Sequence, residues 1–82
     1  MSLFMNNKIK EIVYLQAECL YLYSKKKKIS LKDASYLFNK YHIFEYIFIC
    51  YDYLHLSGID YIVKDIDKRI KEGVDFVKKL AE

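Results

Sequence analysis

The sequence contains no proline, no tryptophan, only two glycines and only two cysteines among its 82 residues. Proline and glycine shape the turns between strands, so their scarcity disfavours a fold of many short strands. A phosphate-binding loop needs a cluster of glycines, and this chain has only Gly58 and Gly73. The length fits one domain and excludes an enzyme with separate cofactor and substrate domains. We expect a single helical domain over residues 1–82, in which residues 1–3 are consistent with an expression-vector remnant.

The two cysteines, Cys19 and Cys50, fit neither a Cys-x-x-Cys motif nor a zinc-binding spacing. Each stands in an apolar stretch, which is typical of a buried free thiol in a cytoplasmic protein, although a disulfide between them remains open. The chain lacks an apolar run of 18 residues, so we expect no membrane-spanning helix. Its first residues lack the pattern of a secretory signal. We expect a cytoplasmic protein without a metal or another cofactor.

Tyrosine and lysine are the residues that this sequence has in excess. Nine tyrosines and five phenylalanines contribute to a hydrophobic share of 54%, while the net charge is +3. Residues 1–41 carry eight lysines against three carboxylates, a net charge of +5, whereas residues 42–82 carry a net charge of −2. Half of those eight lysines form the single run Lys25–Lys28. A nucleic-acid-binding face usually spreads its cations over a surface, so this distribution disfavours nucleic acid as a partner.

Residues 4–25 have the apolar spacing of an amphipathic helix. The stripe that we expect in the core consists of Met5, Ile9, Ile12, Val13, Gln16, Cys19, Leu20 and Tyr23. Leu15 and Leu22 lie at the edge of this stripe, and Tyr14 and Tyr21 lie on the opposite side, where a solitary surface helix would carry charge. We predict that these four side chains bind a partner. The run Lys25–Lys28 ends the helix, either as a solvated cap that meets the helix dipole or as an anion site.

A second helix is predicted to begin after Ser30 and to end near Tyr41. Ser30 is a favourable N-cap, and Asp33 follows three residues later in a pattern close to a capping box. The apolar face of this helix comprises Leu31, Ala34, Leu37, Phe38 and Tyr41. His42 is expected to end the helix in a left-handed conformation, which histidine tolerates better than most residues.

Residues 43–56 form the most apolar segment of the chain. Its main stripe consists of Ile43, Ile47, Cys50, Tyr51 and Leu54, and the opposite side carries Phe48, Ile49 and Leu56. A helix that is apolar nearly all round is buried among several partners, so we expect this one at the centre of the fold. Gly58 is expected to cap its C-terminal end. A strand over residues 46–53 is the alternative, because many β-formers stand there.

Residues 59–81 are predicted to form a long amphipathic helix. Its seam, with alternating spacings of four and three residues, consists of Ile59, Val63, Ile66, Ile70, Gly73, Val77 and Leu80. Gly73 within this seam indicates either a close approach of two helices or a break. The seam suits packing within the chain or against a second copy. The four segments together predict an all-α fold, a compact bundle of four helices with a long C-terminal amphipathic helix.

Asp52 and His55 are the strongest candidates for chemistry, because residues three apart share a helical face and a carboxylate can orient an imidazole there. No nucleophile stands in a position to complete them, and we interpret the pair as the polar strip of a buried helix. Asp65 and Asp67 do not share a helical face, so we interpret them as solvated or in salt bridges. A helix-turn-helix is disfavoured because residues 43–56 contain no lysine or arginine.

Most of the chain resembles a small bacterial family known only as a domain of unknown function. The signature of that family is a Y-D-x-L-H-x-x-G stretch followed by D-I-D. It is matched here by Tyr51, Asp52, Leu54, His55, Gly58, Asp65, Ile66 and Asp67. The resemblance covers roughly residues 9–70, and His42 stands where the family often has glycine. The resemblance implies a bacterial cytoplasmic protein without an assigned activity. Such proteins are often encoded beside toxin-like or ADP-ribosyltransferase-like genes, and the resemblance therefore implies either a partner or an antitoxin-like role.

We predict a non-enzymatic protein–protein interaction module, either a homodimer or a partner-binding subunit, with no membrane and no small-molecule substrate as partner. The surplus apolar surface of the first helix and the heptad seam of the last one support this prediction. The alternative is a small nucleic-acid-binding regulator that uses Lys25–Lys28. A third hypothesis is a small hydrolase or transferase that uses Asp52 and His55.

Overall fold

The computed structural model describes the backbone of residues 7–81 and the side chains of residues 7–78. The predictions for Met5, for the Leu80 side chain and for residues 1–3 lie outside these residues. The elements are α1 (Asn7–Lys27), α2 (Leu31–Lys40), α3 (Ile43–Ile49), α4 (Tyr51–Leu54), α5 (Ile59–Lys71) and α6 (Phe76–Ala81). The described residues contain no strand, so the all-α class is confirmed and the strand alternative is wrong. The predicted four-helix bundle is wrong, because two of the four expected helices are each divided in two.

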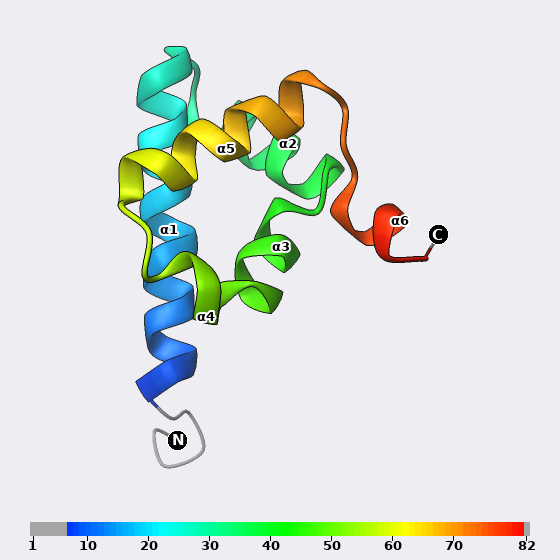
Figure 1. The fold of residues 1–82 in the computed structure, drawn as a ribbon. Helices are drawn as coiled ribbons and strands as arrows, with labels where there is room; N and C mark the ends of the chain where they lie inside the picture. The colour runs from blue at the N-terminus through cyan, green and yellow to red at the C-terminus, as the bar shows by residue number, and fades with distance from the viewer. Residues whose placement is uncertain (1–6, 82) are drawn as a thin grey trace.

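The long helix α1 forms one edge of the molecule, and α5 crosses it (Figure 1). The shorter helices α2, α3 and α4 lie beside α1, and α6 lies beyond α3. None of the helices between residues 7 and 81 combines the length and the apolar character needed to span a bilayer.

Both ends of the link between α1 and α2 are fixed by local hydrogen bonds. At the end of α1, Lys28 is left-handed with a φ of 57°, and the Ile29 amide donates to the Ser24 carbonyl at 3.0 Å. This is the bond that satisfies a late carbonyl when a helix ends on a left-handed residue. At the start of α2, the Ser30 hydroxyl accepts a hydrogen bond from the Asp33 amide at 3.0 Å, which confirms the predicted N-cap.

The predicted left-handed residue at the end of α2 is also confirmed, since His42 has a φ of 55°. The segment that follows departs from the prediction, because Cys50 leaves helical geometry with a φ of −97° and a ψ of 15° and separates α3 from α4. The helix resumes when the Leu54 amide donates to the Cys50 carbonyl at 2.8 Å. Gly58 does not cap the preceding helix; its extended conformation, φ −66° and ψ 149°, makes it the N-cap of α5.

The predicted long C-terminal helix ends at Lys71, and of the two roles considered for Gly73 the break is the correct one. Gly73 has a φ of 70°, its amide donates to the Ile70 carbonyl at 3.1 Å, and the Val74 amide donates to the Arg69 carbonyl at 2.9 Å. These two bonds form a Schellman motif, which stops a helix at a left-handed residue. Helix α6 then begins after Asp75, whose Oδ1 accepts from the Lys78 amide at 3.0 Å.

The core lies where α1, α2, α3 and α5 meet. Its buried members are Cys19, Tyr23, Ala34, Phe38, Ile43, Tyr46, Ile47, Leu54, Ile62, Val63 and Ile66. The ring centroids of Tyr23 and Phe38 are 5.4 Å apart, within the usual range of aromatic pairs. Val13 is an exception to the predicted core stripe of α1, since it is 47% exposed. Both Cys19 and Cys50 are free thiols.

Candidate functional site

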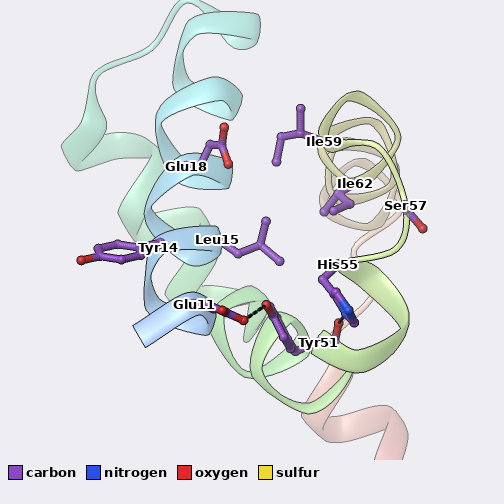
Figure 2. A pocket seen from close by; sticks show the side chains of 9 residues that line it. All are labelled: Glu11, Tyr14, Leu15, Glu18, Tyr51, His55, Ser57, Ile59 and Ile62. Atoms are coloured by element: carbon purple, nitrogen blue, oxygen red, sulfur yellow. Dashed lines mark hydrogen bonds between the residues drawn. The ribbon is translucent and has the colours of Figure 1, made fainter. Parts of the chain in front are cut away.

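The pocket with the most mixed chemistry opens between α1, the α4 turn and the start of α5, and it has a volume of about 320 Å³. Its lining consists of Glu11, Tyr14, Leu15, Glu18, Tyr51, His55, Ser57, Ile59 and Ile62 (Figure 2). Leu15 on α1 and Ile59 and Ile62 on α5 point toward one another across the pocket. The ring of Tyr14 stands at the rim and points away from these side chains.

Tyr51 connects the two sides of this pocket. Its hydroxyl donates a hydrogen bond to Oε1 of Glu11 at 2.9 Å, so α4 is tied to α1 across 40 residues of sequence. Burial raises the pKa of Tyr51, and the hydrogen bond to the Glu11 carboxylate raises it further, because both favour the neutral phenol. The ring of Tyr51 stacks on the imidazole of His55 at a centroid distance of 4.8 Å and an angle of 11°. Tyr51 therefore remains a protonated hydrogen-bond donor at neutral pH.

His55 is oriented by the main chain and not by a carboxylate. Its Nδ1 lies 2.9 Å from the Tyr51 carbonyl, and since a carbonyl only accepts, Nδ1 carries the proton. The predicted contact between Asp52 and His55 is absent, because the Asp52 carboxylate points out and pairs with Lys8 at 3.0 Å. Ser57 makes no hydrogen bond to His55 within residues 7–81, and its hydroxyl points away from α1. The pocket thus holds an imidazole without the oriented nucleophile that covalent hydrolysis uses.

The charge of the pocket comes from Glu11 and Glu18, and no lysine or arginine lines it. Glu18 makes no hydrogen bond or ion pair with the described part of the chain. The opposite charge gathers further along α1, in a groove of about 460 Å³. That groove is lined by Leu22, Lys25, Lys26, Asp60, Val63 and Lys64. Two neighbouring concave sites along α1 and α5 therefore carry opposite charge.

The lysine run at the end of α1 does not act as a unit. Nζ of Lys27 pairs with Oδ1 of Asp67 at 3.1 Å, and this ion pair is partly shielded from solvent. Nζ of Lys25 lies 5.5 Å from the ring centroid of Tyr21. Lys28 occupies the left-handed turn position. Only Lys25 and Lys26 of the run line the basic groove.

The aspartates of the Asp65–Asp67 stretch hold helices together. Oδ2 of Asp65 accepts from the Tyr46 hydroxyl at 2.6 Å and from Nε of Arg69 at 2.9 Å, which joins α5 to α3. The guanidinium of Arg69 lies 4.0 Å from the centroid of the Tyr46 ring. Burial, followed by the hydrogen bond to Asp65, raises the pKa of Tyr46 well above its ordinary range. Ile66, between the two aspartates, is fully buried.

The four side chains predicted to bind a partner divide into two pairs. Tyr14 and Tyr21 are exposed, at 70% and 50% of their surface. Leu15 and Leu22 are half-buried and pack against the core, so their remaining surface borders the acidic pocket and the basic groove. The structure thus places these residues together along α1, and only the tyrosines protrude.

A second exposed apolar surface was missed by the sequence analysis. We use the name α3–α4 face for four exposed side chains, Phe48 and Ile49 on α3, Tyr53 on α4 and Leu56 just after α4, which are 53%, 57%, 64% and 79% exposed. The expectation that residues 43–56 are buried all round is wrong, because only the side that carries Ile43, Ile47 and Leu54 meets the core. The apolar side chains opposite that stripe were the signal that could have identified this surface.

The described residues contain no group of three or more side chains arranged to hold a metal ion. The two histidines have separate partners, since Nδ1 of His42 lies 2.9 Å from Oδ1 of Asp75 while His55 bonds to the main chain.

A family model described as a protein of unknown function (DUF3791) matches residues 15–73, which is well over half of the chain. The matched range spans the eight residues on which the resemblance described above is based. No curated protein and no solved structure matches the chain significantly.

Proposed function

This chain belongs to the DUF3791 family of proteins of unknown function, and we propose that it is a non-enzymatic interaction module that binds a protein partner through the α3–α4 face. The observation that carries the proposal is the exposure of all four side chains of this face in a domain of only 82 residues. Exposed apolar clusters of this kind mark interaction sites. The core is contiguous without these side chains, so they are not needed to complete it.

The face extends onto the first turn of α5. Ile49, Tyr53 and Leu56 follow one another at intervals of four and three residues. The neighbouring Tyr53 is the main cause that raises the pKa of Tyr61, so these two tyrosines adjoin, and Tyr61 is itself exposed. Tyrosine is enriched at interface cores because it buries a large rigid ring and keeps a polar group for the partner.

The charge around this face indicates the chemistry of the partner. Residues 41–63 contain no lysine or arginine, and the carboxylates of Glu45, Asp52 and Asp60 are exposed there. A complementary partner has an apolar centre and a basic rim, because like charges on two rims repel. The same proposal places the module in the bacterial cytoplasm, where its two free thiols are stable.

The absence of catalysis is part of this proposal and is supported by the pocket. His55 donates to a main-chain carbonyl, Asp52 pairs with Lys8, and no hydroxyl or thiol is bonded to the imidazole within residues 7–81. General-base activation of a nucleophile needs a hydrogen bond between the two, or one water between them.

The test is affinity purification from the native host, with the product of the neighbouring gene co-expressed. The wild type is expected to retain a protein that the Ile49→Glu/Leu56→Glu variant loses. Tyr36→Glu is the matched control, since Tyr36 is an exposed aromatic residue on α2, which contributes no side chain to this face. The captured protein is then purified, and its Kd is measured for the wild type, the double variant and Tyr36→Glu. Equal affinity for wild type and double variant, with both folded by circular dichroism, would refute the proposal.

The second candidate function is a nucleic-acid-binding regulator, which the groove lined by Lys25, Lys26 and Lys64 favours. Such binding weakens steeply with salt. Duplex DNA that binds equally to the wild type and to a variant with Lys25–Lys28 changed to alanine would remove this candidate.

A further inference from the structure

The exposed side of α1 carries a charge pattern that the proposed α3–α4 interface does not use. Glu11, Tyr14, Glu18, Tyr21 and Lys25 are separated by three, four, three and four residues, so they form one stripe along the helix. All five side chains are exposed. We call this stripe the α1 face. Its first half is acidic, its last turn is basic, and a tyrosine separates each charge from the next.

Each charged half of the α1 face borders one of the two concave sites. Glu11 and Glu18 line the pocket of about 320 Å³, and Lys25 and Lys26 line the groove of about 460 Å³. At a rise of about 1.5 Å per residue, the midpoint of Glu11 and Glu18 lies roughly 16 Å along α1 from the midpoint of Lys25 and Lys26. The helix forms one edge of the molecule (Figure 1), so a second long helix can approach it.

We propose that the α1 face is the binding site for the α1 face of a second copy of this chain, arranged antiparallel. In that arrangement Lys25 and Lys26 of each copy reach the Glu11–Glu18 pocket of the other. The contact is made twice around a two-fold axis near the middle of α1, as in most homodimers. Tyr14 and Tyr21 lie between the charged ends and supply the apolar centre of the interface.

The charge pattern selects a second copy in preference to other occupants. A partner of one sign can satisfy only one of the two sites and is repelled by the other. An antiparallel copy satisfies both at once, because it presents the same two charges in the opposite order. A parallel copy places acid against acid and base against base. This pairing uses a different surface from the α3–α4 face and goes beyond the function proposed above.

The experiment reverses the charges of one half at a time and measures mass by sedimentation equilibrium. The wild type is expected to be a dimer, and the Glu11→Lys/Glu18→Lys and Lys25→Glu/Lys26→Glu variants are each expected to dimerise at least about tenfold more weakly. An equimolar mixture of the two double variants is expected to restore dimers, because the reversed halves are again complementary. The quadruple variant is expected to restore them as a homodimer.

Two controls make the result specific. Lys32→Glu/Lys71→Glu reverses two exposed charges on α2 and α5, neither of which belongs to the α1 face or lines the two concave sites, and is expected to dimerise like the wild type. Glu11→Lys also removes the hydrogen bond to Tyr51, so Lys25→Glu/Lys26→Glu serves as the variant that leaves this bond intact. Circular dichroism confirms that each chain is folded.

Four outcomes would overturn the proposal: a monomeric wild type at millimolar concentration, double variants that dimerise like the wild type, a mixture that stays monomeric, or a control variant that dissociates. If the two copies paired in parallel, the double variants would dimerise like the wild type. Like charges would then face each other in the wild type and in each double variant. A monomeric wild type leaves partner binding by the α3–α4 face intact, so the two proposals fail separately.

Discussion

The α1 face and the α3–α4 face are both aromatic, but charge is distributed over them differently. The α1 face changes sign from Glu11 to Lys25 along one helix, whereas the α3–α4 face lies in a stretch with no lysine or arginine between residues 41 and 63. A surface that contains both signs in order can pair with a copy of itself. A surface bordered by one sign repels its own copy and requires a different partner. If both proposals hold, this difference in charge separates self-association from partner binding within one small domain.

The change with the largest expected effect disrupts the scaffold that supports both faces. Asp65→Ala leaves the buried hydroxyl of Tyr46 without its acceptor and removes the hydrogen bond of Arg69. We expect the free energy of unfolding to fall by about 2 kcal/mol, because an unsatisfied buried donor costs roughly this much. Urea denaturation followed by circular dichroism measures the loss.

Asp67→Ala is the matched control for that prediction. It removes only an ion pair with Lys27, whose side chain is 35% exposed. A pair with an exposed partner contributes about 1 kcal/mol or less. Equal losses from the two variants would show that the Tyr46–Asp65–Arg69 cluster does not stabilise the fold more than a partly exposed ion pair does.

The next largest effect is expected from salt, which should weaken binding by the two faces to different extents. Raising NaCl from about 0.05 to 0.5 M should weaken α1 pairing about tenfold, because the Debye length shortens and exposed charges are screened. The complex through the α3–α4 face should change less than about threefold, because burial of apolar surface is not screened. Sedimentation equilibrium measures the first quantity and calorimetric titration the second. Equal salt dependence would remove the distinction between the faces.

Gly73→Ala acts on a part of the molecule that belongs to neither face. Gly73 has a φ of 70°, and a Cβ built there meets no atom within 4 Å, so the cost comes from the backbone alone. We expect a loss of about 1 kcal/mol in thermal denaturation, with dimerisation and partner binding unchanged. Gly58→Ser is the control, because Gly58 is an N-cap with a negative φ and serine is favourable there. A loss of the same size in Gly58→Ser would contradict the explanation.

The smallest expected effect is the response to acid at the α6 end, also outside both faces. The Lys78 amide, which donates to Asp75, and the nearby His42 ring lower the pKa of Asp75 below its ordinary value of 3.8. A lowered carboxyl pKa contributes stability above pH 3.8 and loses that contribution as pH falls through the folded-state value. Between pH 5 and pH 2, the free energy of unfolding should therefore fall less steeply for Asp75→Asn than for the wild type. Identical slopes would show that Asp75 does not contribute.

Local signals made the first half of the fold predictable. Ser30 with Asp33 starts α2, and His42 ends it, because capping depends on residues within one turn. The division at Cys50 had no such signal, since residues 43–56 are continuously apolar and tertiary packing decides which side meets the core. Gly73 was visible as a breaker, but periodicity alone could not distinguish a break from a close approach.

The candidate sites were predictable only to the extent that one helix contains them. The exposure of Tyr14 and Tyr21 follows from their position opposite the core stripe of α1. In the acidic pocket Tyr51 bonds to Glu11, and Tyr46 on α3 bonds to Asp65 on α5. Both bonds connect different helices, so the spacing of residues within one helix could not predict them. The α3–α4 face was misassigned because an 82-residue chain has too few helices to cover every apolar side.

Lys28 and His42 are non-glycine residues with positive φ in this domain. Glycine at either position would raise the thermal stability of the fold. A left-handed conformation costs an ordinary residue about 1 kcal/mol relative to glycine. Each turn therefore carries a conformational cost, and a substitution by glycine at either position would remove it. The cost at His42 retains a ring beside Asp75, and the cost at Lys28 retains a cation at the end of α1. Homologues from warmer habitats would be expected to carry glycine at these turns.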